Sequence, residues 1–358
     1  MIFIGLDVHV RNSYLHVSDR QGRRLAHGRV GNTLGAFAEF LGPFETQQPI
    51  VASLESTTNS RAVHRLLERY GQEAGIDLTA QVLDARRLRV IAQSVCKNDR
   101  VDAAVLNELT RSNLKLPTCY VPDDEVFALR EHLRSRSDLV RMRTMVKNRI
   151  HSVLHRRGVL VPAKLDLFTK AGRAWLQAVE LDQAGRSILG RYLETFEAIG
   201  AVIKQSDHDL KKLTGQDRWC KPCALLQTMP GVGLITALTV LAELGDLERF
   251  RSRSAVANYA GLVPVVRDSN DKRYRGSITK QGSTHLRHVL MEAAWVAVGR
   301  SAKYAQVYER VAGRKHKMIA IVAVARKMLE DAFIMLKQGR VFRDVGAVTP
   351  PSASSAAG

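Results

Sequence analysis

The chain has 358 residues, 45% of them apolar, so it can bury a sizeable core and is not a basic disordered tail. Lysine and arginine number 54 against 35 aspartates and glutamates, and the resulting formal charge of +19 favours a polyanionic partner such as nucleic acid. Four cysteines (Cys96, Cys119, Cys220 and Cys223) are too few for a disulfide scaffold and indicate a reducing compartment, so we expect a cytoplasmic protein.

The first third of the chain alternates strand and helix patterns. Three early strands followed by alternating strands and helices are typical of an α/β domain, which we place at residues 1–118. The strands are predicted at Ile2–Val8, Ser13–Ser18, Leu25–Val30, Pro49–Leu54 and Leu78–Leu83, and the helices at Arg61–Tyr70 and Asp99–Leu109.

Residues 119–221 are predicted to form a helical, coiled-coil arm. Apolar residues recur every three or four positions from Val126 to Val153, which predicts one long amphipathic helix. A second helical stretch, Lys164–Thr214, would return antiparallel to it. Residues 130–157 contain nine lysines and arginines against two acids. This excess is too large for a merely solvated face, so the arm is expected to bind phosphates, to dimerise, or both. The candidate contacts with nucleic acid are Arg141, Arg143 and Lys147.

Residues 222–340 are predicted to form a mostly α-helical domain, followed by a disordered tail at 341–358. The uncharged run Pro222–Ala242 is broken by Pro230–Gly233, which favours two buried helices and a turn over a membrane span. A polar stretch, Arg267–Gly282, has no apolar periodicity. Helices are predicted at Ala224–Met229, Leu234–Leu244, Ser254–Ala260, Thr284–Gly299 and Lys317–Lys337.

Two carboxylates follow apolar runs that have the pattern of buried strands. Asp7 follows Ile2–Leu6, and Glu55 follows Ile50–Leu54. An ionised carboxylate beside a core is costly unless a partner or a metal ion neutralises it. These two acids are therefore candidates for a cation site.

Asp99 and Asp102 are three residues apart, so they share one face of the predicted helix. With the two strand acids they would form a hard-oxygen site suited to Mg²⁺ or Mn²⁺, able to hold two ions for displacement at a phosphorus. Each acid alone is better explained as a turn or cap residue, and Asp99 could be the N-cap of its helix. Only the combination with an α/β scaffold and the charge of +19 favours a metal site.

These motifs resemble those of a known family. GLDVH at 5–9, LEST at 54–57 and KNDRVDA at 97–103 are similar to the acidic motifs of RuvC-like domains with the ribonuclease H fold. Their order and spacing resemble the DEDD-type insertion-sequence transposases, which are bridge-RNA-guided recombinases. Three segments of the last third resemble the second domain of that family, its transposase domain. They are LLQTMPGVGLITALTVLAELGD at 225–246, ANYAGLVP at 257–264 and ITKQGSTHLR at 278–287.

The resemblance implies a fold, a reaction and partners. The fold is a RuvC-like α/β domain followed by the helical arm and the mostly α-helical C-terminal domain. The reaction is the cutting and rejoining of donor and target DNA by a serine nucleophile and a metal-bound tetrad of Asp7, Glu55, Asp99 and Asp102. The partners are an element-encoded bridge RNA and further copies of the chain, as a dimer or tetramer, in a prokaryotic cytoplasm at the nucleoid.

The nucleophilic serine of the family follows an AGL-x-P motif, which is Ala260–Pro264 in this chain, and its position falls on Ser269. Asn270 replaces the glycine that commonly follows, so Ser277 and Ser283 are alternatives. By its residue type alone, a serine in a polar loop is ordinarily a turn former. The basic residues expected to contact the scissile phosphate are Arg267, Arg273, Arg275 and Lys280.

Two further motifs have ordinary explanations beside the functional ones. Leu226–Ala237 resembles a helix-hairpin-helix element, in which backbone N–H groups face a phosphate, although a plain helix connection fits as well. Cys220 and Cys223 form a lone C-x-x-C with no second pair at zinc spacing, and we interpret them as ordinary thiols rather than half a zinc site or a redox pair.

Three functions remain open at this point. The first is the metal-dependent recombinase with a serine nucleophile. The second is a RuvC-like structure-specific endonuclease that hydrolyses DNA directly and forms no covalent adduct. The third is a non-enzymatic nucleic-acid binder, against which the four intact acids argue.

Overall fold

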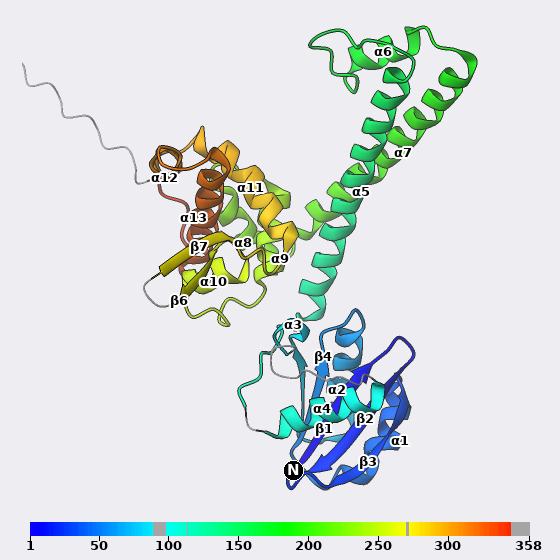
Figure 1. Ribbon diagram of the computed structural model, residues 1–358, viewed down its shortest axis with the longest axis vertical. Helices are drawn as coiled ribbons and strands as arrows, with labels where there is room; N and C mark the ends of the chain where they lie inside the picture. The colour runs from blue at the N-terminus through cyan, green and yellow to red at the C-terminus, as the bar shows by residue number, and fades with distance from the viewer. Residues whose placement is uncertain (89–97, 113, 270–271, 345–358) are drawn as a thin grey trace, which may run out of the picture. The chain divides into compact units, whose positions relative to one another are not determined.

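The computed structural model describes residues 1–88, 98–112, 114–269 and 272–344, and the side chains of residues 266–275 lie outside this description. Cys96, Asn270 and the tail from 345 onward are among the residues that it does not describe. The chain divides into two compact units, Met1–Pro122 and Asp123–Gly358. Each unit is described by itself below, with its elements labelled in Figure 1.

The first unit contains a five-stranded sheet with the order β3-β2-β1-β4-β5. The strands β1, β2 and β3 form an antiparallel meander, and β4 and β5 run parallel to β1. The sequence therefore predicted all five strands, with the bounds of β1 and β5 as observed. The strands are β1 (Ile2–Val8), β2 (Asn12–Asp19), β3 (Arg24–Gly31), β4 (Ile50–Glu55) and β5 (Leu78–Leu83).

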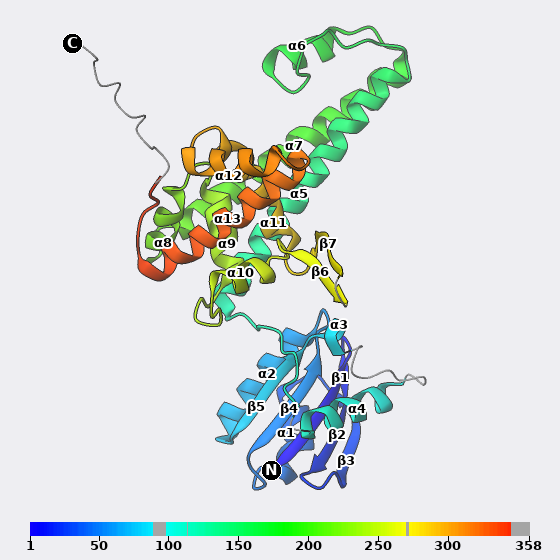
Figure 2. The same ribbon diagram turned by 60° about the vertical axis from the view of Figure 1, so that its left-hand side comes forward.

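Helices cover both faces of this sheet. The even-numbered residues of β1 and β4 pack in one apolar core with α1 and α2, while α4 lies across the opposite face and crosses β1 (Figures 1 and 2). The sequence predicted α2 and α4 but neither α1 nor the short α3. The helices and the 3-10 turn of this unit are α1 (Leu34–Leu41), η1 (Gly42–Phe44), α2 (Ser60–Ala74), α3 (Ala85–Leu88) and α4 (Asp99–Arg111).

A glycine and a buried amide hold α4 close to β1. A Cβ atom on Gly5 would overlap the carbonyl oxygen of Ala103 and the amide nitrogen of Asn107, so only glycine permits this approach. The Asn107 side chain donates to the carbonyl oxygens of Phe3 at 2.6 Å and His16 at 3.0 Å. These contacts fix the position of α4 along the strand.

Two long antiparallel helices form an arm in the second unit. Helix α5 (Asp124–His155) lies beside α7 (Gln183–Leu213), and both views show them side by side (Figures 1 and 2). The short helix α6 (Lys170–Ala178) packs at the tip around a small core of its own. The helical stretch predicted at Lys164–Thr214 is confirmed in part: it contains α6 and α7, and Asp182 accepts a hydrogen bond from the amide of Gly185 at 3.1 Å and starts α7 as a new helix.

The rest of the second unit is a helical body whose core also includes the base of α5 and the end of α7. Most of the predicted helices are confirmed here, but α12 was not predicted. Most of the polar stretch without apolar periodicity, for which the sequence predicted no element, belongs to a two-stranded antiparallel ribbon. The elements are α8 (Asp217–Gln227), α9 (Leu234–Leu244), α10 (Arg253–Tyr259), β6 (Pro264–Ser269), β7 (Lys272–Ile278), α11 (Thr284–Val298), α12 (Ala302–Ala312) and α13 (Lys317–Gln338).

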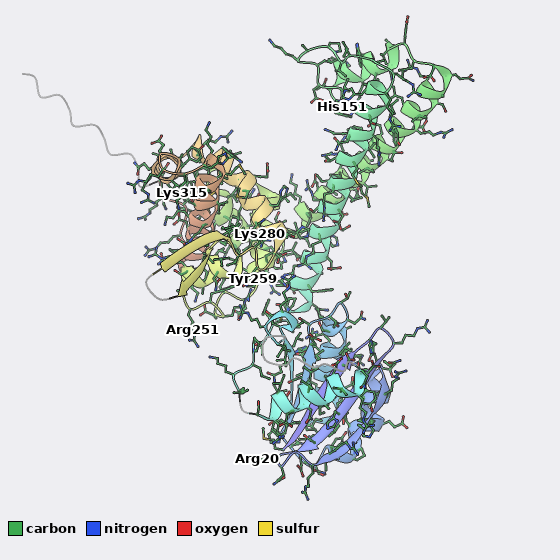
Figure 3. The ribbon with its side chains drawn as sticks, viewed as in Figure 1. Arg20, His151, Arg251, Tyr259, Lys280 and Lys315 are labelled. Carbon is green, nitrogen blue, oxygen red and sulfur yellow. The ribbon has the colours of Figure 1, made fainter. Side chains whose placement is uncertain are left out.

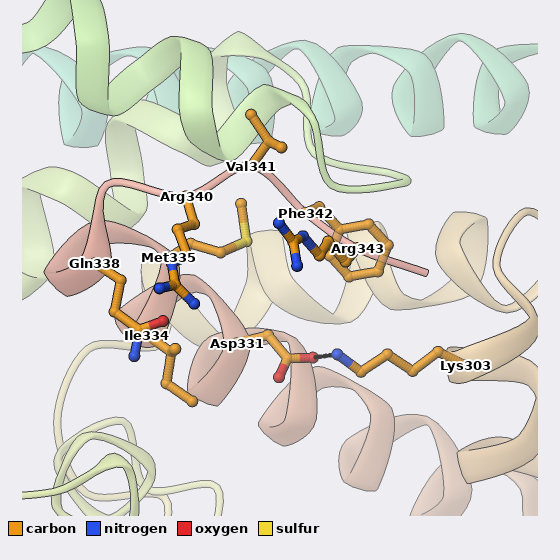
Figure 4. Close-up of a pocket in the computed structure, with 9 residues that line it drawn as sticks. All are labelled: Lys303, Asp331, Ile334, Met335, Gln338, Arg340, Val341, Phe342 and Arg343. Atoms are coloured by element: carbon orange, nitrogen blue, oxygen red, sulfur yellow. Dashed lines mark ion pairs between the residues drawn. The ribbon is translucent and has the colours of Figure 1, made fainter. Parts of the chain in front are cut away.

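Residues 339–344, which we name the C-terminal strap, close the helical body after α13. The Phe342 ring stacks on Tyr304, with ring centroids 5.4 Å apart, and its amide donates to Thr228 Oγ1 at 2.9 Å. The Asp344 carboxylate caps α12 by accepting from Ser301 Oγ at 3.0 Å and from the first amides of that helix. The strap also lines a cavity of about 190 Å³ (Figure 4).

The buried Asp331 carboxylate lies at this cavity, between two lysines. Lys303 Nζ is 2.7 Å from one of its oxygens (Figure 4). Lys327 Nζ is 2.9 Å from the other oxygen, and Tyr304 donates to the carboxylate at 3.2 Å. Among the described residues, no helix is both long and apolar enough to cross a membrane.

Candidate active site

Two of the predicted acids lie at neighbouring strand ends on the α4 face of the sheet. The parallel register of β1 and β4 ends at the pair Leu6 and Leu54, and Asp7 and Glu55 each follow that pair by one residue. Alternation along the strands places both acids on the face opposite the α1–α2 core. Both are partly buried. The ends of two strands therefore present two carboxylates to α4.

The other two acids occupy the first turn of α4. Asn98 is the N-cap of this helix, with its side-chain oxygen accepting from the amide of Val101 at 2.8 Å. Asp99 is therefore not the N-cap of α4, which was the structural role considered for it from the sequence. Because α4 runs antiparallel to β1, its first turn lies at the strand end where Asp7 is.

Asp7 and Asp99 converge with a histidine. His9 Nε2 is 3.5 Å from Asp7 Oδ2 and 3.3 Å from Asp99 Oδ2. One ligand atom from each of these three residues lies within 4.8 Å of the others. Arg29, from β3, reaches Asp99 Oδ2 at 3.1 Å. The sequence singled out the two acids but assigned no role to His9 and did not identify Arg29.

The electrostatics of the cluster favour a cation. Burial raises the pKa of Asp7, and the nearby charges of Asp99 and Asp102 raise it further against the opposing effect of His9. Burial also acts to raise the pKa of Asp99, but the hydrogen bonds from His9 and Arg29 outweigh it, so the pKa is lowered. A site in which carboxylates repel one another gains from a bound positive charge.

The four predicted acids are brought together to different degrees. Asp7 and Asp99 form the close cluster with His9. Asp102 lies near enough for its charge to act on Asp7. Glu55 lies on the adjacent strand and same face, outside the three-residue cluster. The donor set of carboxylate oxygens and one imidazole nitrogen fits a divalent cation such as Mg²⁺ or Mn²⁺.

In the second unit, the AGLVP segment at 260–264 and the KQGS segment at 280–283 pack with their backbones in direct contact. A Cβ on Gly261 (φ +68°) would overlap the backbone of Gln281, and one on Gly282 (φ +76°) would overlap the Tyr259 carbonyl. The amide of Thr279 donates to the Val263 carbonyl at 2.9 Å. Both glycines are thus needed for close approach as well as for their backbone conformation. Together these two segments form the base of the β6–β7 ribbon.

The three candidate serines have different places on or beside this ribbon. Ser269 is the last residue of β6 and pairs with Lys272, while its side chain lies outside the described atoms. Ser277 is exposed on β7. Ser283 is the N-cap of α11 and accepts from the amide of Leu286 at 3.2 Å, which gives it a structural role.

Three of the four basic residues predicted around Ser269 belong to the same ribbon, and the fourth, Lys280, follows it. Lys280 is exposed in the turn after β7 and has a left-handed backbone conformation (φ +53°) (Figure 3). The side chains of the other three candidates lie outside the described atoms, although their backbones belong to β6 and β7. These residues are Arg267, Arg273 and Arg275.

The three basic candidates on the arm differ in their surroundings. Arg141 pairs with Asp138. Lys147 Nζ lies 4.4 Å from the centre of the Phe168 ring. Arg143 forms no ion pair among the described residues. Two of the three charges are therefore already engaged within the chain.

The helix-hairpin-helix-like segment is the α8–α9 connection. Gly231 (φ +81°) packs against the Ala293 carbonyl of α11, and Gly233 starts α9 without a side-chain cap. A hollow of about 580 Å³ beside this turn is lined by Arg300 among others.

The two cysteines of the C-x-x-C motif lie on α8. Cys223 is buried and Cys220 is exposed, and both thiols are free.

Comparison with known proteins adds independent evidence. Residues 4–157 match a family model described as a transposase, and residues 223–309 match the model of the transposase IS116/IS110/IS902 family. The chain belongs to the DEDD-type insertion-sequence transposases. It is a DNA transposase, its substrates are DNA, and its family implies a divalent metal ion, which the Asp7–His9–Asp99 cluster fits.

Several curated relatives resemble this transposase over different lengths. The transposase for insertion sequence element IS1328 of Yersinia enterocolitica is 24% identical over 344 residues, which are 95% of this chain and 98% of the relative. The transposase for element IS1111A of Coxiella burnetii is 26% identical over 75% of this chain and 74% of its own length. The pilin gene-inverting protein of Moraxella bovis is 32% identical over 39% of this chain and 45% of its own length.

Proposed function

We propose that this transposase cuts and rejoins DNA strands with a divalent metal ion held by Asp7, Glu55, Asp99 and Asp102 and with Ser269 as the nucleophile. The observation that supports it most strongly is the convergence of the end of β1 and the first turn of α4, with one ligand atom each of Asp7, His9 and Asp99 within 4.8 Å of the others. The five-stranded order β3-β2-β1-β4-β5 with α4 across β1 supports a RuvC-like, ribonuclease H-type domain.

Each group has a distinct task in this proposal. A bound Mg²⁺ or Mn²⁺ supplies Lewis-acid stabilisation of the phosphate oxygens. The four carboxylates hold that ion, and His9 orients the carboxylates of Asp7 and Asp99 through its two contacts. Ser269 Oγ attacks the phosphorus, its proton leaves to solvent or a nearby base, and the displaced DNA hydroxyl takes a proton in return.

The covalent step explains why rejoining needs no external energy source. A phosphoserine diester replaces the broken phosphodiester, so the number of phosphodiester bonds is unchanged. A DNA hydroxyl from the new partner reverses the step and releases Ser269. The acids and Ser269 must reach the same phosphate, within one chain or between copies.

The remaining partners follow from the family resemblance. We propose a bridge RNA as the guide and a homodimer or homotetramer as the working assembly, with the arm at 119–221 as a coiled coil distinct from the C-terminal domain at 222–340. The α8–α9 turn is proposed as a sequence-independent backbone contact of the helix-hairpin-helix kind. The surplus of positive charge supports nucleic-acid partners without distinguishing RNA from DNA.

The decisive experiment mixes the purified protein and its co-purified RNA with cognate DNA and Mg²⁺, then looks for DNA-linked protein on a denaturing gel. Ser269→Ala should bind DNA yet form no adduct and exchange no strands. Ser277→Ala, on the paired strand of the same ribbon, is the matched control and should form the adduct at the wild-type rate. An adduct that disappears only in Ser277→Ala would move the nucleophile to that position.

The acidic tetrad is tested separately with Asp102→Asn. Because the acids repel one another without metal, this change should leave the melting temperature of the metal-free protein unchanged or higher. It should abolish Mg²⁺-dependent strand cleavage. Full cleavage by this variant would exclude Asp102 from the site.

A structure-specific endonuclease that hydrolyses DNA directly is the alternative. It would give Mg²⁺-dependent cleavage that needs the four acids, no covalent adduct, and full cleavage by Ser269→Ala. The same gel therefore separates the two functions.

A further inference from the structure

The turn between α12 and α13 carries positive charge that the fold leaves unbalanced. Residues 313–319 are exposed without interruption, and Figure 3 labels Lys315 on this turn. The only acid beside it in sequence is Glu309. Four cations lie within residues 310–317, and none forms an ion pair among the described residues. They are Arg310, Arg314, Lys315 and Lys317.

The arm has more basic residues, but its structure engages many of them. Arg130 is buried and donates to two carbonyl oxygens at the end of α9. Three further arginines of α5, and Arg157 just after it, face carboxylates, so their charges are offset within the chain. These pairs are Arg134–Glu243, Arg136–Asp207, Arg141–Asp138 and Arg157–Asp182.

The polarity of α13 makes the charge on the turn costly for folding. Lys317 is the first residue of this 22-residue helix, whose first turn contains no acid. Cations at a helix N-terminus repel the positive end of the helix dipole. The N-cap is His316, whose Nδ1 accepts from the amide of Met318 at 3.2 Å. Lys317 is therefore unfavourable for α13, whereas Arg310 lies in the last turn of α12, where a cation is favourable. An anion at the start of α13 would gain from both the side chains and the dipole of that helix.

We propose that the α12–α13 turn, residues 310–317, binds the sugar–phosphate backbone of a nucleic acid. The cations contact successive phosphates without reading bases, so the binding is independent of sequence. Duplex DNA and structured RNA share this backbone chemistry. The surface lies outside the acidic cluster and the β6–β7 ribbon, and its binding does not depend on the proposed chemistry.

The test uses the full-length protein in EDTA, so that neither the acids nor Ser269 can act. Arg314→Gln, Lys315→Gln and Lys317→Gln are combined in one variant. Its affinity is measured by fluorescence anisotropy, over a range of salt concentrations, for a random-sequence DNA duplex and for an RNA hairpin. Each lost phosphate contact should reduce the salt slope of log Kd by about 0.7–0.9, so the three substitutions together should reduce it by about 2–3 and weaken the Kd by a factor of about ten or more.

The matched control removes the same charge elsewhere in the same unit. Lys204, Lys211 and Lys221 are exposed, lie on α7 and α8, and form no ion pair among the described residues. Their triple replacement by glutamine should leave both the Kd and the slope near wild type. The probe that loses affinity with the turn variant, but not with the control, identifies DNA or RNA as the ligand.

Two results would overturn the inference. One is an unchanged Kd and slope of the turn variant with both probes, and the other is an equal loss in the control variant. The turn variant should melt near the wild-type temperature, because its three substituted side chains are exposed and form no ion pair among the described residues. A failure of the adduct experiment with Ser269 would leave these binding results intact, since they involve no strand cleavage.

Discussion

At the residue scale, Gly5 determines how closely α4 approaches β1 and therefore where Asp99 and Asp102 lie. We predict that Gly5→Ala destabilises the first unit by about 1–3 kcal/mol, because the new Cβ would displace the helix backbone. Metal-dependent cleavage should fall with it, since the displaced helix carries two of the acids. Denaturant unfolding and a cleavage assay measure the two effects.

The control for this change is Gly28→Ala on β3, where a Cβ would meet the Phe40 ring at an ordinary 3.5 Å. It should alter the unfolding free energy by less than about 1 kcal/mol. Wild-type stability of Gly5→Ala would show that α4 has room to move away from the sheet.

His285 predicts a pH dependence in the second unit. Burial lowers its pKa, and Arg134 lowers it further despite the opposing charge of Glu243. The folded protein therefore favours the neutral ring, while the unfolded chain takes up the proton first as the pH falls through about 6.5. Stability should drop as the pH is lowered across this range. In His285→Gln the drop should be smaller, as followed by denaturant unfolding at several pH values, and parallel curves for the two proteins would contradict this.

The acids of the site were predictable, but their partners were not. Asp7 follows a recognisable buried strand, and the spacing of Asp99 and Asp102 already placed them on one helix face. His9 lies beyond the end of β1, where alternation no longer fixes the side chain. Arg29 comes from β3, and its approach to Asp99 depends on how the sheet and α4 pack, which no local pattern encodes.

At the element scale, the arm is joined to the helical body by an arginine that caps another helix. Arg130 donates to the carbonyl oxygens of Ala242 at 2.7 Å and Glu243 at 3.1 Å, at the C-terminus of α9. Hydrogen bonds from a buried charged donor are worth more than neutral ones, so Arg130→Met should cost about 2–4 kcal/mol of unfolding free energy. Arg149→Met, at an exposed site of the same helix, should stay within about 0.5 kcal/mol. Equal effects of the two changes would mean that the cap contributes little.

Elements with strong apolar periodicity were predicted well from the sequence. Elements whose bounds depend on strand pairing in a polar segment or on a capping side chain were not. The bounds of α9 and of β1 agree with the sequence pattern because both are buried. The β6–β7 ribbon was missed because its sequence is mostly polar and lacks the apolar pattern of a strand that packs on a core. The break between α6 and α7 depends on the capping side chain of Asp182, which a search for periodicity does not detect.

At the scale of the whole molecule, net charge predicted a polyanion but not where it binds. The formal charge of +19 is a property of the composition. Ion pairs between residues far apart in sequence, such as Arg136 with Asp207, determine which basic side chains remain free to bind a nucleic acid. The arm, which is rich in basic residues, is therefore a weaker candidate surface than its sequence suggests.

The C-terminal strap has a consequence for the order in which the second unit folds during synthesis. Asp344 is made 43 residues after Ser301, so α12 emerges from the ribosome with only its Ser301 cap and waits roughly 2–9 s for the Asp344 contacts at ordinary translation rates. Thr228, which accepts a hydrogen bond from the Phe342 amide, is made even earlier than Ser301. The helical body of a nascent chain therefore stays open until translation has passed α13, and its apolar core is accessible to chaperones for that interval.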